Sequence, residues 1–127
     1  MPNAAVKKFI EELKVADMPF FEDGNRIVCG GAAALIVEPD LQSETPTMYR
    51  FEIPTAWKKE QEFSYAMLFL HVFFGLIFLI PIRSQLKALL EEGVPFSAHN
   101  QDLDLRGFVE GEEVVFLVKS HHHQQAP

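Results

Sequence analysis

The sequence predicts an α+β fold: a single domain with a mainly antiparallel sheet, an N-terminal helix, and a second helix at about residues 84–92. Three observations support this class. An amphipathic helical pattern opens the chain, short apolar segments separated by turn signals follow it, and a second helical pattern comes after the most apolar stretch. A chain of 127 residues has the size of one domain. We expect this domain to span residues 1–119 and residues 120–127 to form a flexible tail that contains histidines.

The first helix is expected over residues 3–16, and a hairpin should follow it. Apolar side chains recur at helical spacing in this segment, at Val6, Phe9, Ile10 and Leu13. Beyond it, the turn signal Asp23-Gly24-Asn25 stands between two apolar segments. It predicts a hairpin that joins a strand over Pro19–Glu22 to a strand over Arg26–Cys29.

Two more strands are expected before the middle of the chain. Ala32–Glu38 is apolar and follows Gly30-Gly31, where the glycines form either a bulge within one strand or a tight turn. Thr47–Ile53 alternates longer polar side chains with aromatic and apolar ones, which is typical of a half-buried strand.

A helix and a final hairpin are expected in the last third of the chain. Ser84 is a suitable N-cap for the helix over 84–92, and Gly93 ends it. The turn signal Glu110-Gly111-Glu112 then joins two strands, over Asp102–Arg106 and Val114–Lys119.

The stretch from Phe63 to Ile82, FSYAMLFLHVFFGLIFLIPI, carries no formal charge and has three interpretations. The favoured one is a pair of buried strands, Phe63–Leu70 and Leu76–Ile80, because the stretch is rich in phenylalanine and β-branched residues. A membrane-spanning helix is the second, since twenty helical residues cover about 30 Å. A buried helix of the same length is the third.

The strand-pair interpretation predicts an apolar turn between the two strands, and this turn would have to be buried against another surface. Such a turn is expected to contact either a second copy of the chain or a protein partner. The residues assigned to this interface, within apolar surface near residues 68–80, are Val72, Phe73, Phe74, Leu76 and Phe78.

The charge of the chain limits the classes of partner. The chain has 18 acidic and 11 basic residues, a net charge of −7, and no basic block. The electrostatic field of a chain with this negative charge repels nucleic acid, so we expect no general nucleic-acid binding. A metal-dependent nuclease is compatible with this charge, because bound cations offset local acidity. The N-terminal segment is charged and lacks a hydrophobic signal region, so a cytoplasmic location is expected.

Several side chains are candidates for chemistry. Cys29 lies in an apolar strand and is expected to be a small core residue. His71 lies within the apolar stretch and is expected to be a neutral core histidine, and His99 lies close in sequence to Asp102 and Asp104. The tail residues could bind a transition metal, although a flexible tail is favoured: His121, His122 and His123.

Part of the chain resembles a known superfamily. The passage from YRFEIPTAW (Tyr49–Trp57) to FLIPIRSQLKALL (Phe78–Leu90) is similar to small restriction-endonuclease-like nucleases of the PD-D/E-x-K superfamily. The resemblance implies a divalent metal, Mg²⁺ or Mn²⁺, held by two carboxylates, with a lysine two residues after the second acid. Asp40 and Glu52 are the metal ligands it implies, but Pro54 stands at the lysine position, so the motif is incomplete.

These observations favour a non-enzymatic module for protein–protein contact or regulation, expected to be a homo-oligomer or to bind a protein partner. No cofactor is expected. A metal-dependent nuclease is one alternative, and it would require Mg²⁺ or Mn²⁺. A single-span membrane protein through residues 63–82 is another.

Overall fold

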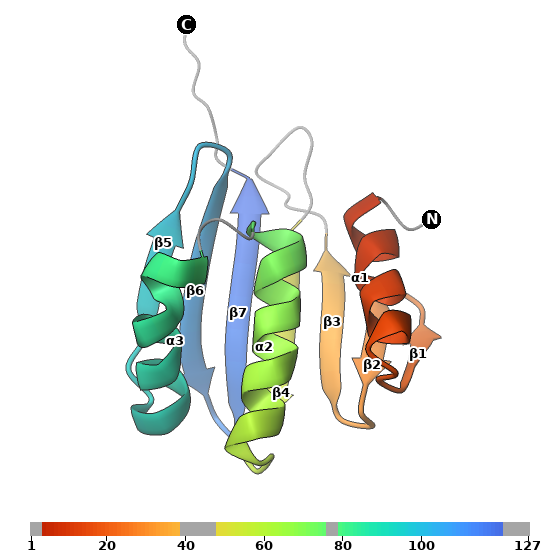
Figure 1. The fold of residues 1–127 in the computed structure, drawn as a ribbon, viewed down its shortest axis with the longest axis horizontal. Helices are drawn as coiled ribbons and strands as arrows, with labels where there is room; N and C mark the ends of the chain where they lie inside the picture. Colours follow the sequence, from red (N-terminus) through yellow and green to blue (C-terminus); the bar gives the residue numbers. More distant parts are fainter. Residues whose placement is uncertain (1–3, 39–47, 76–78, 121–127) are drawn as a thin grey trace, which may run out of the picture.

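The α+β class is confirmed by a computed structural model, which describes residues 4–38, 48–75 and 79–120. Seven strands form one sheet, and three helices accompany it (Figure 1). In chain order the elements are α1 (Ala4–Val15), β1 (Phe20–Asp23), β2 (Arg26–Cys29), β3 (Ala33–Glu38), β4 (Met48–Pro54), α2 (Lys59–Phe73), α3 (Leu79–Glu92), β5 (Phe96–His99), β6 (Leu103–Glu110) and β7 (Glu113–Ser120).

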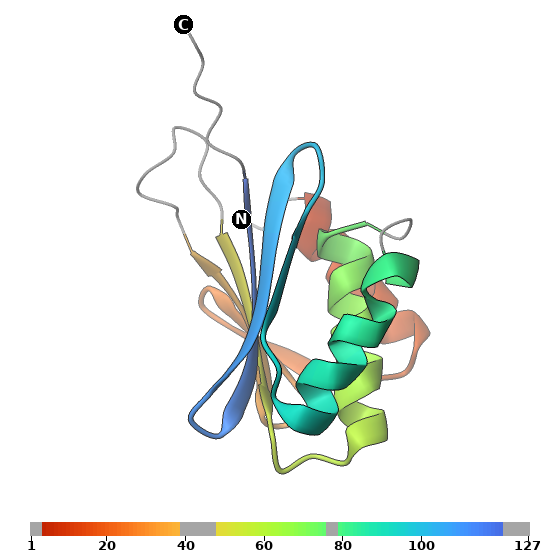
Figure 2. The same cartoon turned by 90° about the vertical axis from the view of Figure 1, so that its left-hand side faces the viewer.

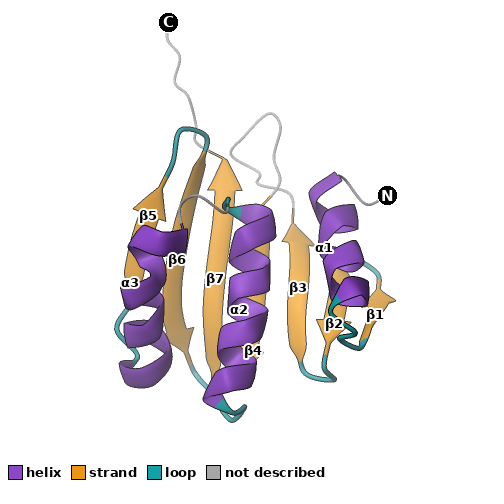
Figure 3. Cartoon of the chain, in the orientation of Figure 1, coloured by secondary structure: helices purple, strands orange, loops and turns teal. Residues whose placement is uncertain are grey.

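The sheet is antiparallel throughout, in the order β1-β2-β3-β4-β7-β6-β5. Strands β1 to β4 form a meander, the two following helices leave the sheet, and β5 to β7 return as a second meander. Strands β4 and β7 then pair at the junction, although they are far apart in sequence (Figure 3). This pairing unites the two halves of the chain.

All three helices lie on the same face of the sheet, as the edge-on view shows (Figure 2). Because strand side chains alternate between faces, every second residue of each strand packs under the helices. On β4 these residues are Tyr49, Phe51 and Ile53, and their register partners on β7 are Val118, Phe116 and Val114. The alternation predicted for residues 47–53 is therefore confirmed.

The local predictions at the two ends of the chain are confirmed within one or two residues for most elements. The helix predicted over 84–92 ends as expected but begins earlier, at Leu79, so Ser84 lies within α3 and is not its N-cap. Helix α1 buries Val6, Phe9 and Leu13, as the helical spacing predicted. The two glycines at positions 30 and 31 form a tight turn between β2 and β3, with φ values of +60° and +87°. Strand β5 was not predicted, because a four-residue edge strand with the sequence FSAH gives only a short pattern. Beyond β7, the tail residues 121–127 lie outside the described residues.

The predicted strand pair at Phe63–Leu70 and Leu76–Ile80 is wrong. Residues 63–70 lie within α2, residues 79 and 80 begin α3, and residues 76–78 lie outside the described residues. The buried side chains of α2 follow helical spacing along one side: Glu62, Tyr65, Ala66, Phe69, Leu70 and Phe73.

Two helices replace the single long one because the chain turns after Phe73. Gly75 has a φ of +116°, a backbone conformation that residues other than glycine rarely adopt. Its backbone N–H donates a hydrogen bond to Leu70 O at 3.0 Å. Helix α2 lies between α1 and α3 and also covers the sheet. A helix with neighbours on three sides is apolar nearly all round, which removes the periodicity that identifies an amphipathic helix. In the described parts of the chain, no helix has both the length and the apolar character to cross a membrane.

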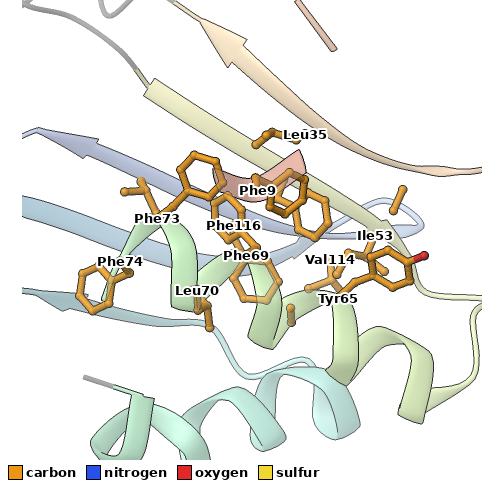
Figure 4. Packing of buried hydrophobic residues seen from close by; sticks show 14 of the residues in the cluster. Phe9, Leu35, Ile53, Tyr65, Phe69, Leu70, Phe73, Phe74, Val114 and Phe116 are labelled. Atoms are coloured by element: carbon orange, nitrogen blue, oxygen red, sulfur yellow. The ribbon is translucent and has the colours of Figure 1, made fainter. Parts of the chain in front are cut away.

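Phenylalanine side chains from four elements, α1, β4, α2 and β7, form the centre of the core (Figure 4). The ring of Phe69 stacks on Phe51 at 5.1 Å between centroids and on Phe73 at 4.9 Å, and it lies 6.1 Å from Phe116. Phe9 of α1 meets the ring of Phe51 edge-on at 5.9 Å. Aromatic contacts of these geometries add to the stability that burial provides. They tie α1 and α2 to the central strands β4 and β7.

Candidate functional site

The second face of the sheet has no helix over it in the described part of the chain (Figure 2). We call this surface the open face. It consists of the strand residues that alternate with the core residues. The open face of the four central strands comprises Ala34, Ile36 and Glu38 of β3, Met48, Arg50, Glu52 and Pro54 of β4, Glu113, Val115, Leu117 and Lys119 of β7, and Asp104, Arg106, Phe108 and Glu110 of β6.

Strand register places three arginines in one line across the open face. Reading from β2 to β6, the register partners are Arg26, Ile36, Arg50, Leu117 and Arg106. We call this line the arginine row. The chain has four arginines, and only Arg83 lies elsewhere, on α3. Because neighbouring strands lie about 4.8 Å apart, successive arginines of the row stand about 10 Å apart, each separated by one aliphatic side chain.

A more apolar line runs beside the arginine row, one pleat further along the strands. Its register partners are Phe21, Val28, Ala34, Glu52, Val115 and Phe108. Phe21 is 56% exposed at the outer end of the line, whereas Ala34 and Val115 are buried at its centre. A hollow of about 270 Å³ lies at the opposite edge of the sheet, where Ser97, Arg106 and Phe108 contribute to its wall.

Arg50 is held in place at the centre of the open face by two carboxylates. Its Nε donates to Glu52 Oε2 at 2.5 Å, and its Nη2 donates to Glu110 Oε1 at 2.6 Å. The hydrogen bond to Glu52 is the main cause that raises the pKa of Arg50. The side chains of Arg50 and Glu52 are 23% and 18% exposed, so this pair is already partly removed from water. The hydrogen bonds to Glu52 and Glu110 fix the orientation of the Arg50 guanidinium, so this group is preorganised.

Glu113 lies on the same face as this network, on β7. Its pKa is raised by desolvation, and the negative charge of Glu52 adds to the shift. A cation brought close to Glu113 would therefore stabilise the charged form of its carboxylate.

Known proteins offer no guide here. Comparison with models of protein families, with curated proteins and with solved structures finds no match to this chain. The similarity to PD-D/E-x-K nucleases remains a prediction from the residues that suggested it.

Of the two residues predicted as metal ligands, only Glu52 lies within the described part of the chain. Glu52 lies on β4 and accepts the hydrogen bond from Arg50 Nε. Asp40 lies outside the described residues. Within the described ranges, no group of three or more histidine, cysteine, aspartate or glutamate side chains is arranged to hold a metal ion.

The described residues that were predicted to form an interface at a hairpin tip lie instead at the C-terminal end of helix α2. Phe73 and Phe74 are 4% and 2% exposed and belong to the core, and Val72 is half-buried. Leu76 and Phe78 lie outside the described residues. The exposed tip does not form because helix α2 directs Phe73 and Phe74 toward the sheet and its neighbouring helices, where burial is favourable.

Among the remaining candidates for chemistry, the described ones lie on different elements, and two of them, His99 and Asp104, are register partners. His71 is half-buried on α2, and the predicted tail histidines lie outside the described residues. His99 is the register partner of Asp104 on the open face, whereas Asp102 is exposed in the turn before β6. Cys29 is fully buried, and desolvation raises its pKa to about 12. Such a thiol has little thiolate at neutral pH, so Cys29 is a core residue rather than a nucleophile.

Sequence reasoning missed one charged core residue, Glu62. It is fully buried on the first turn of α2, and its carboxylate Oε1 lies 3.2 Å from Lys59 Nζ. Desolvation raises the pKa of Glu62, and Lys59 opposes this shift. Helical numbering of the segment would have revealed it, because Glu62 precedes Ala66 and Phe69 on the buried stripe.

Proposed function

We propose that the chain is a non-catalytic protein-binding module whose binding surface is the open face of the sheet. The observation that supports this most strongly is the arginine row, in which Arg26, Arg50 and Arg106 alternate with Ile36 and Leu117 on a face that no described helix covers. Arginine and aromatic side chains are enriched in protein interfaces, and hot spots contain them often.

The mixed charge of the open face favours a protein over nucleic acid as the ligand. Basic side chains on the four central strands are Arg50, Arg106 and Lys119, and acidic ones are Glu38, Glu52, Asp104, Glu110 and Glu113. Acidic groups outnumber basic ones on this face as they do in the whole chain, which has a net charge of −7. A nucleic-acid surface would need an excess of basic groups to neutralise phosphates.

The open face is also well suited to a binding role by its rigidity. The strands that form it are fixed from the other side by the aromatic core around Phe69. A preorganised surface loses little conformational freedom when a partner docks, which favours affinity. We place this module in the cytoplasm, where the single buried thiol of Cys29 needs no oxidising environment.

A photo-crosslinking amino acid at two matched positions tests the proposal in cells. Phe108 lies on the open face with the Arg106 guanidinium 5.5 Å from its ring, and Phe63 lies on α2 with the Arg83 guanidinium 5.3 Å from its ring. Both rings are half-buried. We expect the crosslinker at Phe108 to give discrete protein adducts and the one at Phe63 to give few. Absence of adducts from Phe108, or equal adducts from both positions, would contradict the proposal.

The metal-dependent nuclease alternative is tested separately. Glu52 would have to release Arg50 to bind Mg²⁺ or Mn²⁺, because the guanidinium occupies that carboxylate. We expect no cleavage of DNA or RNA above background with either ion. Cleavage that Glu52→Ala abolishes would support the nuclease instead.

A further inference from the structure

We infer that the partner of the open face is a second copy of the chain, related by a two-fold axis that crosses the strands between Arg50 and Glu52. This inference rests on the proposed function and names the partner. Two sheets that pack face to face keep their strand directions within about 30° and lie about 10 Å apart. A two-fold axis across the strands places each strand over its own copy, running in the opposite direction.

Strand β7 has a charge pattern that is complementary to itself in this arrangement. Its open-face residues are, in order, Glu113, Val115, Leu117 and Lys119. Against the reversed copy, Glu113 faces the partner's Lys119 and Val115 faces the partner's Leu117. Both ends of the strand thus place opposite charges together, and the middle places aliphatic side chains together.

Strand β4 matches itself in the same register. Arg50 faces the partner's Glu52, and Met48 faces the partner's Pro54, since these residues occupy successive positions on the open face. The Arg50–Glu52 pair within each chain would thereby become a four-membered network of two arginines and two glutamates around the axis. Networks of this kind bring more to an interface than isolated exposed pairs.

The next strand, β6, adds one favourable and one unfavourable contact. Arg106 faces the partner's Phe108, which suits a guanidinium that already lies over an aromatic ring within its own chain. Asp104 faces the partner's Glu110, and these like charges repel. Two basic residues of the same chain reduce this repulsion. Arg50 donates a hydrogen bond to Glu110, and Lys119 is the register partner of Asp104.

The other two-fold arrangement of the face is disfavoured by charge. An axis along the strands at β4 would place the arginine row on itself, with Arg50 against the partner's Arg50 and Arg26 against the partner's Arg106. Like charges placed directly opposite each other weaken an interface and exclude wrong registers. The row therefore selects the axis that crosses the strands.

The face is large enough for a specific dimer. Seven strands about 4.8 Å apart give a width of about 29 Å, and the strands, which have four to eight residues, give a mean length of about 20 Å. The projected area is on the order of 600 Å², and protruding side chains make the accessible area larger. A standard protein interface buries about 800 Å² on each partner.

A charge-swap experiment tests the inference with full-length protein. Arg50→Glu places a carboxylate against the partner's Glu52, and Glu52→Arg places a guanidinium against the partner's Arg50. A dimer of either variant alone contains two repulsive contacts, and we expect each contact to raise the dimer dissociation constant about tenfold. The expected total rise is therefore about 100-fold. Mixing the two variants restores opposite charges at both contacts, and we expect a mixed dimer. An effect confined to one chain would not be reversed by mixing.

Sedimentation velocity measures the outcome, and circular dichroism checks that each variant is folded. Should either variant at the Arg50–Glu52 pair not fold, Lys119→Glu and Glu113→Lys apply the same logic on β7. Arg83→Glu on α3 is the control and should leave the dimer unchanged. A monomeric wild-type chain at about 100 μM, a concentration far above typical dissociation constants, would overturn the inference. So would dimers of either swapped variant alone, or a mixture that stays monomeric.

The crosslinking experiment separates failure of this inference from failure of the proposed function. Adducts from Phe108 that join two copies of the chain support both. Adducts from Phe108 to a different protein, together with a monomeric wild-type chain, overturn the second-copy inference and keep the binding module. No adducts at all overturn both.

Discussion

Lys59→Met is expected to destabilise the protein more at about pH 8 than at about pH 4, because its main electrostatic partner is the buried Glu62. The Nζ of Lys59 makes two contacts that methionine would lose. It lies 3.2 Å from Glu62 Oε1 and donates a hydrogen bond to Leu90 O at 2.7 Å. Methionine keeps an apolar side chain of similar length, so packing changes little.

The size of the effect follows from these two contacts. Unit charges 3.2 Å apart interact by about 1.3 kcal/mol in water and about 5 kcal/mol at an effective dielectric constant of 20. The Lys59 side chain is 56% exposed, so solvent screening places the coupling to Glu62 near the lower end, at about 1–2 kcal/mol. Loss of the hydrogen bond to Leu90 O costs about 1.5 kcal/mol more. We expect a total loss of about 3 kcal/mol when Glu62 is charged.

The pH dependence follows from the direction of the Glu62 shift. Its folded-state pKa is raised above the ordinary value of 4.5 by desolvation. The folded state therefore binds this proton more tightly, and the free energy of unfolding falls as the pH rises from the ordinary carboxyl range through the raised pKa. Below that range Glu62 is neutral, so Lys59→Met should cost only the hydrogen bond to Leu90 O. Glu113 also has a raised pKa and adds a fall of the same sign.

Urea unfolding of four proteins gives the test: wild type, Lys59→Met, Glu62→Gln and the double variant, each at about pH 4 and pH 8. We expect a coupling of about 1–2 kcal/mol at the higher pH and none at the lower. Glu62→Gln alone should stabilise the protein at about pH 8 and flatten its pH dependence. Equal coupling at both pH values, or a Glu62→Gln variant that is destabilised at about pH 8, would refute the reasoning.

Three further outcomes are expected. Phe69→Ala should lower the free energy of unfolding by about 3–5 kcal/mol in urea titrations, because it removes the ring at the centre of the aromatic core, and a loss below about 1 kcal/mol would contradict that placement. Gly107→Ala should lower it by about 1–3 kcal/mol, since its Cβ would stand 2.7 Å from the Phe96 ring and 3.0 Å from Leu89; an unchanged midpoint would show that the contact relaxes freely. Cys29 should resist thiol reagents in the native protein and react on unfolding, because it is buried with a pKa of about 12, and fast labelling of native protein would disprove its burial.

Local patterns in the sequence predicted the elements whose partners are close along the chain. The spacing of Val6, Phe9 and Leu13 identified α1 because one side of that helix faces solvent and the other faces the core. The turn signals around Gly24 and Gly111 located two hairpins, since a tight turn depends on the few residues that form it.

The same reasoning failed at residues 63–82. Helix α2 packs against the sheet and two other helices, so apolar residues surround it and the periodicity of an amphipathic helix is weak. Its phenylalanines then favoured a strand. Glu62 was overlooked for a related reason, because its burial is visible only once the segment is numbered as a helix against the sheet.

The sequence by itself determined the α+β class, the α1 helix and the local hairpins, because short-range periodicity and turn chemistry specify such elements. Only the tertiary structure decided the pairing of β4 with β7, and with it the surface on which a function is now proposed. Arg26, Arg50 and Arg106 lie on three strands that are distant along the chain, and no local pattern relates them. Strand register, which depends on how both meanders bury their apolar residues against the helices, brings the three arginines into one row.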